Sequence, residues 1–499
     1  MVHSPRLRAR RALSKSALQF TGNSGTGYNN MTRVLSFHRV GLLAALLFVG
    51  IGSALHAQTV ANSDVANSNS TLGRHVLTMY GVLHQESGDS PLDFPSPEVI
   101  LGHRLLVEMG TRNATPQIAN DTPFITAGKI SSHADDGAAT THRYFITGLG
   151  TLGGTESFAY ALNGSGQVVG SSRTSEDVST HSFLYSNGRM TDLFPLNSQS
   201  IQTVGPTGIN NSGQIASGLI VGGVYSPALL DSTTGALTLL GSLGGVTSFG
   251  FNGVATSVNN LGHAVGYSYI DAIDRHAFLY SDGTMTDIDS FGGYSVAFAI
   301  NDEGVIVGLA SPNNGPATAF VYRQGVTTNI FPLGTESDAR DVNNRGQVVG
   351  EFLTADQTAF HGFLYSDGVI TDLGSPNSPE TIAFAINDQQ QVAGTTFVPF
   401  ETTCSGVPCV QYAPHAFFYE GGNMTDLNAL IPSASGWVLS WGMDINNNGQ
   451  IAGYGVLKDK FRAFLLTPAT SKEQCKDGGW QTFGFRNQGQ CIQFVNIDK

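Results

Sequence analysis

One short phrase recurs seven times in this sequence and constrains the fold more than any other feature. Its copies read "LNGSGQVVGS" from Leu162, "INNSGQIASG" from Ile209, "VNNLGHAVGY" from Val258, "INDEGVIVGL" from Ile300, "VNNRGQVVGE" from Val342, "INDQQQVAGT" from Ile386 and "INNNGQIAGY" from Ile445. They follow one another at intervals of 42 to 59 residues. A period in the forties is typical of an array of similar supersecondary units.

Each repeat predicts four antiparallel strands. In the fourth repeat these are "SVAFAIN", "GVIVGLA", "TAFVYR" and "GVTTNI". In other repeats an Asn-Gly or Asp-Gly pair separates the last two strands, and these pairs supply the positive φ of a two-residue hairpin turn. The recurring phrase predicts a second hairpin, in which Asn301 starts a type I turn and Gly304 takes the left-handed position.

The first strand of each repeat indicates where the repeat lies in the fold. Its residues alternate between small and large apolar side chains, and in the fourth repeat the small face comprises Ser295, Ala297 and Ala299. A strand of this kind is buried on both sides between closely spaced sheets. This is typical of the innermost strand of a propeller blade, where blades converge on an axis.

The two ends of the repeat array predict how the ring closes. The last repeat stops at "RAFLLTP" (462–468) without a fourth strand, while an unassigned strand, "RYFITG" from Arg143, precedes the first repeat. The early strand can complete the last blade and remove its open edge. We therefore predict an all-β fold, a seven-bladed β-propeller of four-stranded antiparallel blades closed by an N-terminal strand. An open solenoid of the same hairpins is the alternative.

The chain divides into four predicted segments. "MTRVLSFHRVGLLAALLFVGIGSALHAQ", from Met31, has the basic, apolar and small-residue order of a secretory signal peptide (31–57), with cleavage expected after Ala57. Its apolar part is too short to favour a membrane anchor. Residues 1–30 then read as upstream sequence from an earlier start codon, so translation starts at Met1 or Met31. A poorly structured leader (58–141), the propeller (142–469) and a disulfide-closed tail (470–499) follow.

The charge of the mature chain argues against two classes of partner. Removal of residues 1–57 takes away 7 of the 25 basic residues and none of the 38 acidic ones, which leaves a formal charge of −20. A chain this acidic repels nucleic acid and anionic lipid. We expect a monomer that is secreted to the periplasm, the cell surface or the medium, with no membrane insertion of the mature chain.

Four cysteines form two close pairs in the sequence. Cys404 and Cys409 bracket "CSGVPC", and Cys475 and Cys491 bracket the tail. An even number of cysteines in a secreted chain predicts disulfides, here two local ones. The alternative is a metal site, which is disfavoured because no histidine lies at ligand spacing beside either pair.

Taken together, "INxxGQVVGY", "HAFLY", "S(N/D)G" and "MTDLGTLGG" resemble the bacterial extracellular HAF-repeat family. The tripeptide stands at 276–278 and 415–417, and the resemblance covers about 142–468. The second repeat departs from it with "SPALLDSTTG", and the sixth has Gln390 where the turn glycine belongs. The tail resembles a short cysteine-bracketed ending found on assorted secreted bacterial proteins. The resemblance implies export and a propeller-like fold, and it implies no established reaction.

Several residue patterns that suggest chemistry have simpler interpretations. His181, His276, His361 and His415 occupy one repeated position, so the ring separates them, whereas a catalytic or metal site needs converging groups. The "INDEG" type of turn offers too few acids for calcium, and "GTLGG" lacks the lysine of a phosphate loop. We therefore expect no metal and no cofactor.

A functional site is expected where the repeats differ. On the small face of the first strand, the fifth and seventh repeats replace a small residue with Asp341 and Asp444. Both carboxylates should project near the axis, where they either line a solvated channel or bind a cationic or polyhydroxyl ligand. Trp437 or Trp441 is a candidate stacking platform for that ligand. Arg340 lies on the opposite face of its strand and is not expected to pair with Asp341.

Three classes of function remain open. The first is a non-catalytic binding or interaction module whose ligand is a glycan or a protein, and we favour it. The second is a secreted hydrolase or lyase that acts on polysaccharide with carboxylates from different blades. A purely structural role in an envelope or matrix is a third possibility. The propeller fold hosts all of these, so the fold does not decide between them.

Overall fold

The structure is a computed structural model. It describes residues 125–127, 129–130, 142–193, 201–221, 223–245, 250–288, 292–312, 315–332, 335–374, 378–404 and 407–496. The upstream segment, the signal peptide and most of the leader predicted from the sequence lie outside these residues.

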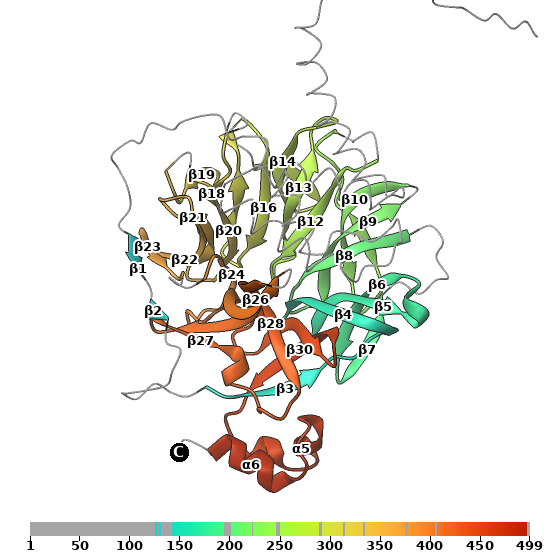
Figure 1. Cartoon of the computed structure of the whole chain (residues 1–499). Helices are drawn as coiled ribbons and strands as arrows, with labels where there is room; N and C mark the ends of the chain where they lie inside the picture. The colour runs from blue at the N-terminus through green and yellow to red at the C-terminus, as the bar shows by residue number, and fades with distance from the viewer. Residues whose placement is uncertain are drawn as a thin grey trace, which may run out of the picture. The chain divides into compact units, whose positions relative to one another are not determined.

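The seven repeats form seven antiparallel sheets, and the innermost strands of successive sheets contact one another in a closed ring that joins blade 7 to blade 1 (Figure 1). This confirms the predicted seven-bladed β-propeller. Blades 1 to 3 comprise β4 (Gly153–Leu162), β5 (Val168–Thr174), β6 (Thr180–Ser186) and β7 (Arg189–Asp192); β8 (Ile201–Ile209), β9 (Gln214–Val221), β10 (Val224–Asp231) and β11 (Leu237–Leu239); and β12 (Gly253–Val258), β13 (Ala264–Tyr269), β14 (Arg275–Ser281) and β15 (Thr284–Asp287).

Blades 4 to 7 repeat the arrangement. They comprise β16 (Ser295–Ile300), β17 (Ile306–Ala310), β18 (Thr318–Arg323) and β19 (Val326–Asn329); β20 (Ser337–Val342), β21 (Val348–Leu353), β22 (Phe360–Ser366) and β23 (Val369–Asp372); β24 (Thr381–Ile386), β25 (Val392–Cys404), β26 (Val407–Glu420) and β27 (Asn423–Asp426); and β28 (Trp437–Ile445), β29 (Ile451–Leu457), β30 (Lys460–Pro468) and β3 (Tyr144–Gly148). Two short 3-10 helices, η1 (Ser175–Asp177) and η3 (Leu427–Ala429), lie in connections.

The predicted turns are present. Asp282 and Gly283 have φ values of 51° and 78°, as the two-residue hairpin requires, and Gly304 lies at 75°. Gln390 takes the same left-handed position as Gly304, at 63°. The sixth turn therefore keeps the geometry of the others and forces a non-glycine residue into it.

The N-terminal strand closes the ring as predicted. β3 pairs antiparallel with β30, from Tyr144 opposite Pro468 to Gly148 opposite Phe464. Tyr144 is buried in the core shared by blades 6 and 7. The chain that begins the propeller thus supplies the outer strand of its last blade.

The C-terminal tail packs against this closing strand. It contains η4 (Lys472–Cys475), α5 (Gly479–Thr482) and α6 (Gln488–Asn496), and the predicted Cys475–Cys491 disulfide is confirmed. Phe145 of β3 is fully buried among tail side chains and stacks on Phe483 at 4.0 Å between ring centroids. The tail therefore covers the face of β3 opposite to Tyr144.

The prediction of a single small face on each first strand is wrong. The register with the second strand skips Phe298, so Ala297 and Ala299 lie opposite adjacent residues and face opposite sides. The same one-residue bulge occurs in all seven blades. Ser295 and Ala297 face the preceding blade, where the Ser295 hydroxyl accepts the Ala277 N–H at 2.9 Å.

Two short pieces of the leader add strands to the outside of the ring. β1 (Ile125–Ala127) pairs in parallel with β23, and β2 (Lys129–Ile130) pairs in parallel with β27. Blades 5 and 6 therefore have five strands each.

The sixth repeat is longer than the others around "CSGVPC", and the extra residues extend its second and third strands into a long hairpin. β25 and β26 stay paired from Val392 opposite Tyr419 to Cys404 opposite Val407. Cys409 is disulfide-bonded, whereas the side chain of Cys404 lies outside the described residues. Disulfides form and persist in oxidising compartments. Across the described ranges, no helix is long and apolar enough to cross a bilayer.

Candidate functional site

The asparagine of the recurring phrase forms a closed ring around the axis. Its side-chain Nδ2 donates to the backbone oxygen of the matching asparagine in the next blade at 2.8–3.0 Å, and Asn446 closes the circle onto Asn163. Its Oδ1 accepts backbone N–H groups of its own turn, as Asn301 does from Val305. The ring members are Asn163, Asn210, Asn259, Asn301, Asn343, Asn387 and Asn446. The phrase is therefore a scaffold that holds the blades in register.

The next residue of each phrase forms a polar rim. Its side-chain oxygen accepts the backbone N–H of the preceding blade, as Asp388 does from Asn344 at 2.8 Å. Asp302 and Asp388 are the acids of this rim, and Gly164 contributes no side chain. A cavity of about 220 Å³ opens here, and it is lined by phrase residues of all seven blades.

The residue before each ring asparagine directs its backbone N–H toward the axis. Asn301 donates its N–H to Val305 within the blade, and donors alternate along a strand, so the N–H of Ile300 points to the free inner edge of β16. The asparagine of every blade makes the same bond, so seven such N–H groups point to the axis. They belong to Leu162, Ile209, Val258, Ile300, Val342, Ile386 and Ile445, which all line the cavity.

Two aspartates accept four of these seven N–H groups. Asp341 accepts its own neighbour's N–H, from Val342, at 2.8 Å, and also the N–H of Ile386 in the next blade at 2.8 Å. Asp444 does the same with Ile445 and with Leu162 of blade 1, both at 2.7 Å. Each carboxylate therefore joins two consecutive blades, at the junctions 5/6 and 7/1.

The surroundings raise the pKa of both carboxyl groups. Burial raises the pKa of Asp341 to about 6, and the nearby charge of Asp388 adds to the effect, while the two N–H donors oppose it. Burial, reinforced by the charge of Asp341, raises the pKa of Asp444 to about 7. The two groups thus interact with each other near the axis, and both gain protons just below neutral pH.

Blades 2, 3 and 4 leave their axial N–H groups open. Their residues at the aspartate position are Gly208, Ser257 and Ala299, which carry no carboxylate. Over the ranges that the structure describes, the N–H groups of Ile209, Val258 and Ile300 make no hydrogen bond. The sequence analysis missed these donors, since only the constant position of the residue before each asparagine hints at them.

The tryptophans do not join the aspartates. Trp441 is 8% exposed, and it packs against Tyr454 and Phe397 between blades 6 and 7. Trp437 begins β28, and because the strand has two bulges before Asp444 it lies five ladder positions from it, about 17 Å away at the usual rise of a strand. Neither ring is placed to stack on a ligand bound at the two carboxylates.

Arg340 is the bulged residue of its strand and is paired elsewhere, as expected. Its guanidinium contacts Asp338 at 2.9 Å and Glu351 at 3.1 Å, and lies 5.1 Å from the ring centroid of Phe298. Asp338 and Glu351 are almost completely buried. Arg340 therefore neutralises acids inside blade 5 and is not the counter-ion of Asp341.

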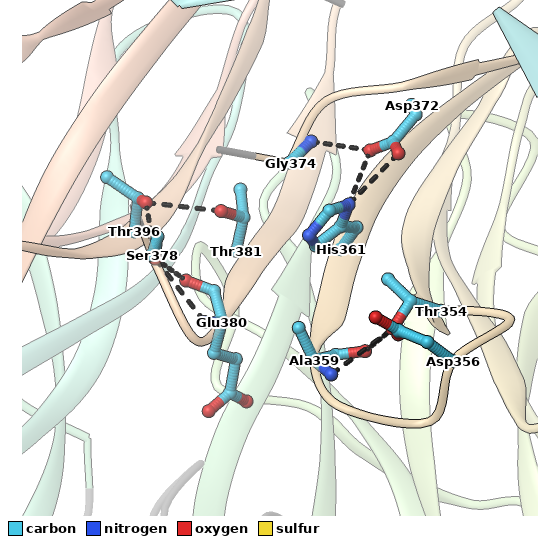
Figure 2. A network of polar contacts seen from close by, with 10 residues as sticks. All are labelled: Thr354, Asp356, Ala359, His361, Asp372, Gly374, Ser378, Glu380, Thr381 and Thr396. Carbon is cyan, nitrogen blue, oxygen red and sulfur yellow. Dashed lines mark hydrogen bonds and ion pairs between the residues drawn. The ribbon is translucent and has the colours of Figure 1, made fainter. Parts of the chain in front are cut away.

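The repeated histidines pair with the repeated "TD" aspartates. Figure 2 shows His361 against Asp372, whose carboxylate also accepts the Gly374 N–H at 2.7 Å. Equivalent Nδ1–carboxylate distances of 2.7 Å join the third and fourth strands of blades 1, 3 and 6. Each pair fastens one blade, which agrees with the structural role predicted for these histidines. No cluster of three or more potential metal ligands occurs within the described part of the chain.

No protein-family model matches the sequence, and no curated protein is significantly similar to it. Among solved structures, TolB from Acinetobacter baumannii is 11% identical with a TM-score of 0.35 and covers 47% of this chain and 63% of that one. A puromycin-hydrolyzing peptidase of Mycobacterium tuberculosis is 10% identical with a TM-score of 0.42 and covers 61% of this chain and 49% of that one.

An oligogalacturonate lyase from Vibrio parahaemolyticus is 8% identical with a TM-score of 0.37 and covers 64% of this chain and 93% of that one. The chain spans less than two thirds of the first two structures. Similarities this weak carry no argument about activity.

Proposed function

We propose that this protein is a secreted propeller that binds a ligand, a glycan or a protein, without transforming it. The observation that carries the proposal is the axial cavity. Beside it the repeated scaffold changes at two positions to Asp341 and Asp444, whose carboxylates accept the N–H groups of two cavity-lining residues, Ile386 and Leu162. Among the described residues, three of the seven axial N–H groups find no acceptor. A polar group left unpaired in such a place is costly, so a site of this kind is expected to bind a ligand. The HAF-repeat resemblance, the signal-peptide pattern and the disulfides support export.

Catalysis is the second candidate, and one observation favours it. Two carboxyl groups that influence each other, with pKa values raised to about 6 and about 7, resemble the acid and base pair that glycoside-cleaving enzymes use. However, every oxygen of the pair already accepts a backbone N–H. Carboxylates held in this way position neighbouring strands, so we rank a hydrolase or lyase below a binding module.

A combined array and turnover experiment tests the proposal. The purified chain from Gln58 is applied to glycan and peptide arrays, and the same polysaccharides are assayed for cleavage. We expect selective binding without turnover, and an affinity that changes at least tenfold in the Asp341→Asn, Asp444→Asn double variant, in which the axis has lost two carboxylates. Asp287→Asn, which changes an aspartate of a blade-fastening pair, is the matched control and should bind normally. Arrays without any selective ligand, or multiple turnovers of a polysaccharide, would show the proposal to be wrong.

A further inference from the structure

The approximate sevenfold symmetry of the axis shows which chemical group fits between two adjacent axial N–H groups. At the junctions 5/6 and 7/1, that group is a carboxylate whose two oxygens each accept one N–H at 2.7–2.8 Å. The gap between blades 3 and 4 presents the same pair of donors, from Val258 and Ile300. The residue that would fill it is Ser257, which is too short to do so.

We infer that this open segment, formed by the N–H groups of Ile209, Val258 and Ile300, binds the carboxylate group of a ligand. A ligand carboxylate would occupy the place that Asp341 and Asp444 occupy in their own blades. The inference deepens the proposed binding role and rests on it, because it names the chemical group that the axial site recognises.

The charges around the axis set the conditions for this binding. The inner residues of the other five blades at this level are uncharged: Ala161, Gly208, Ser257, Ala299 and Ala385. The nearby acids are Asp341 and Asp444 at the same level and Asp302 and Asp388 on the rim. A further anion is repelled by ionised aspartates and tolerated by protonated ones. Binding should therefore strengthen as the pH falls from 8 to 5.5, through the range in which the pair gains protons.

The size of the cavity limits the ligand. About 220 Å³ is below the roughly 300–1,000 Å³ of an ordinary small-molecule pocket. Only a small acid or the end of a longer molecule can enter. A sugar acid and the C-terminus of a peptide carry the same group, and the experiment separates these two sources.

The test fills the gap with a carboxylate introduced by substitution of Ser257. Ser257→Asp should reach the N–H groups of Val258 and Ile300 as Asp341 reaches its partners, whereas Ser257→Ala leaves both open. Calorimetry with acetate, D-glucuronate, triglycine and triglycine amide is run at pH 5.5 and 8.0, with D-glucose as the neutral control. Thermal melting of each variant verifies folding, and Ser257→Asn, with one acceptor oxygen and no charge, serves if Ser257→Asp does not fold.

We expect at least one of the three carboxylate probes to bind the wild type and Ser257→Ala at pH 5.5, about tenfold more weakly at pH 8.0. Ser257→Asp should lose at least ten-fold in affinity, and Ser257→Asn should lose less. Preference for D-glucuronate indicates a sugar acid, and preference for triglycine over its amide indicates a peptide end. The inference fails if no carboxylate binds, if D-glucose or the amide binds as tightly, or if the folded Ser257→Asp or Ser257→Asn variant binds like the wild type. An array ligand unaffected by these variants would leave the binding role intact and remove only the axial carboxylate site.

Discussion

The two parts of the axial ring share one scaffold and differ at one position per blade. From blade 5 round to blade 1, Asp341 and Asp444 cover four axial N–H groups, while blades 2 to 4 leave three open. The asparagine ring is the same on both sides. The comparison teaches that the repeated residues hold the blades together. Only the residues that differ between blades make one side of the axis chemically different from the other.

The covered part also contains the two places where the ring is structurally weakest. It includes the junction 7/1, where closure depends on β3 and not on a continuous chain, and the turn at Gln390. The open part has neither. We therefore expect changes in the covered part to affect stability first and changes in the open part to affect binding first.

The largest effect is expected from removing the strand that makes the junction 7/1. Deletion of residues 143–150 leaves β30 as an exposed edge and uncovers the tail residues that pack on Phe145. The variant should aggregate or lose its single cooperative transition, measured by size-exclusion chromatography and calorimetry. The control is deletion of 125–130, the residues that add outer strands to blades 5 and 6. This variant should melt almost like the wild type. A monomeric deletion variant with an unchanged melting curve would contradict closure by β3.

Removing one of the covering carboxylates should have the next largest effect. Asp444→Ala leaves the N–H groups of Ile445 and Leu162 without their acceptor, and a buried donor without a partner costs about 1–3 kcal/mol. We expect a lower free energy of unfolding at pH 5.5, determined by urea denaturation. Ser257→Ala in the open part, which removes no acceptor from an axial N–H group, should change it by less than about 0.5 kcal/mol. Equal losses for the two variants would abolish the distinction between covered and open blades.

The pH dependence of stability should separate the two parts further. The folded pKa values of Asp341 and Asp444, about 6 and about 7, lie above the unfolded value near 3.9, so the folded state holds more protons between these limits. This contribution is complete below about pH 4 and is lost as the pH rises through 6 and 7. Each unit of pKa difference corresponds to about 1.4 kcal/mol.

The wild type should therefore melt at a higher temperature at pH 5 than at pH 8. In the Asp341→Asn, Asp444→Asn double variant this difference should shrink. The Ser257→Ala variant, with both carboxyl groups intact, should follow the wild type. Parallel melting curves for the wild type and the double variant across this range would show that the two groups titrate normally.

The smallest effect is expected at the turn of blade 6. Gln390 holds a left-handed φ of 63°, which costs a non-glycine residue about 1 kcal/mol, so Gln390→Gly should stabilise by about that amount. The reciprocal change in the open part, Gly304→Gln, should destabilise similarly, because a side chain there meets open space and only φ opposes it. Changes of the same sign in the two variants, measured by urea denaturation, would indicate that local contacts outweigh backbone strain.

The sequence alone predicts much of this architecture because the relevant forces are local and repeated. The spacing of the recurring phrase predicts seven units, Asn-Gly and Asp-Gly pairs predict hairpins, and the unpaired "RYFITG" predicts closure. The alternation of residues along the first strand also predicts that Asp341 and Asp444 lie near the axis. These inferences need only strand periodicity and the backbone preferences of turn residues.

What the sequence could not reveal depends on contacts between blades. The bulge at Phe298 and its equivalents changes which face each residue occupies, and strict alternation cannot detect an extra residue. The acceptor of the Leu162 N–H is Asp444, 282 residues away, and the acceptor of the Ile386 N–H is Asp341, 45 residues away. The sequence determined the units, their number and the positions where they differ. Only the tertiary structure decided which axial N–H groups those differences cover and which they leave open, because a backbone donor finds its partner through the geometry of neighbouring blades and not through the residue that carries it.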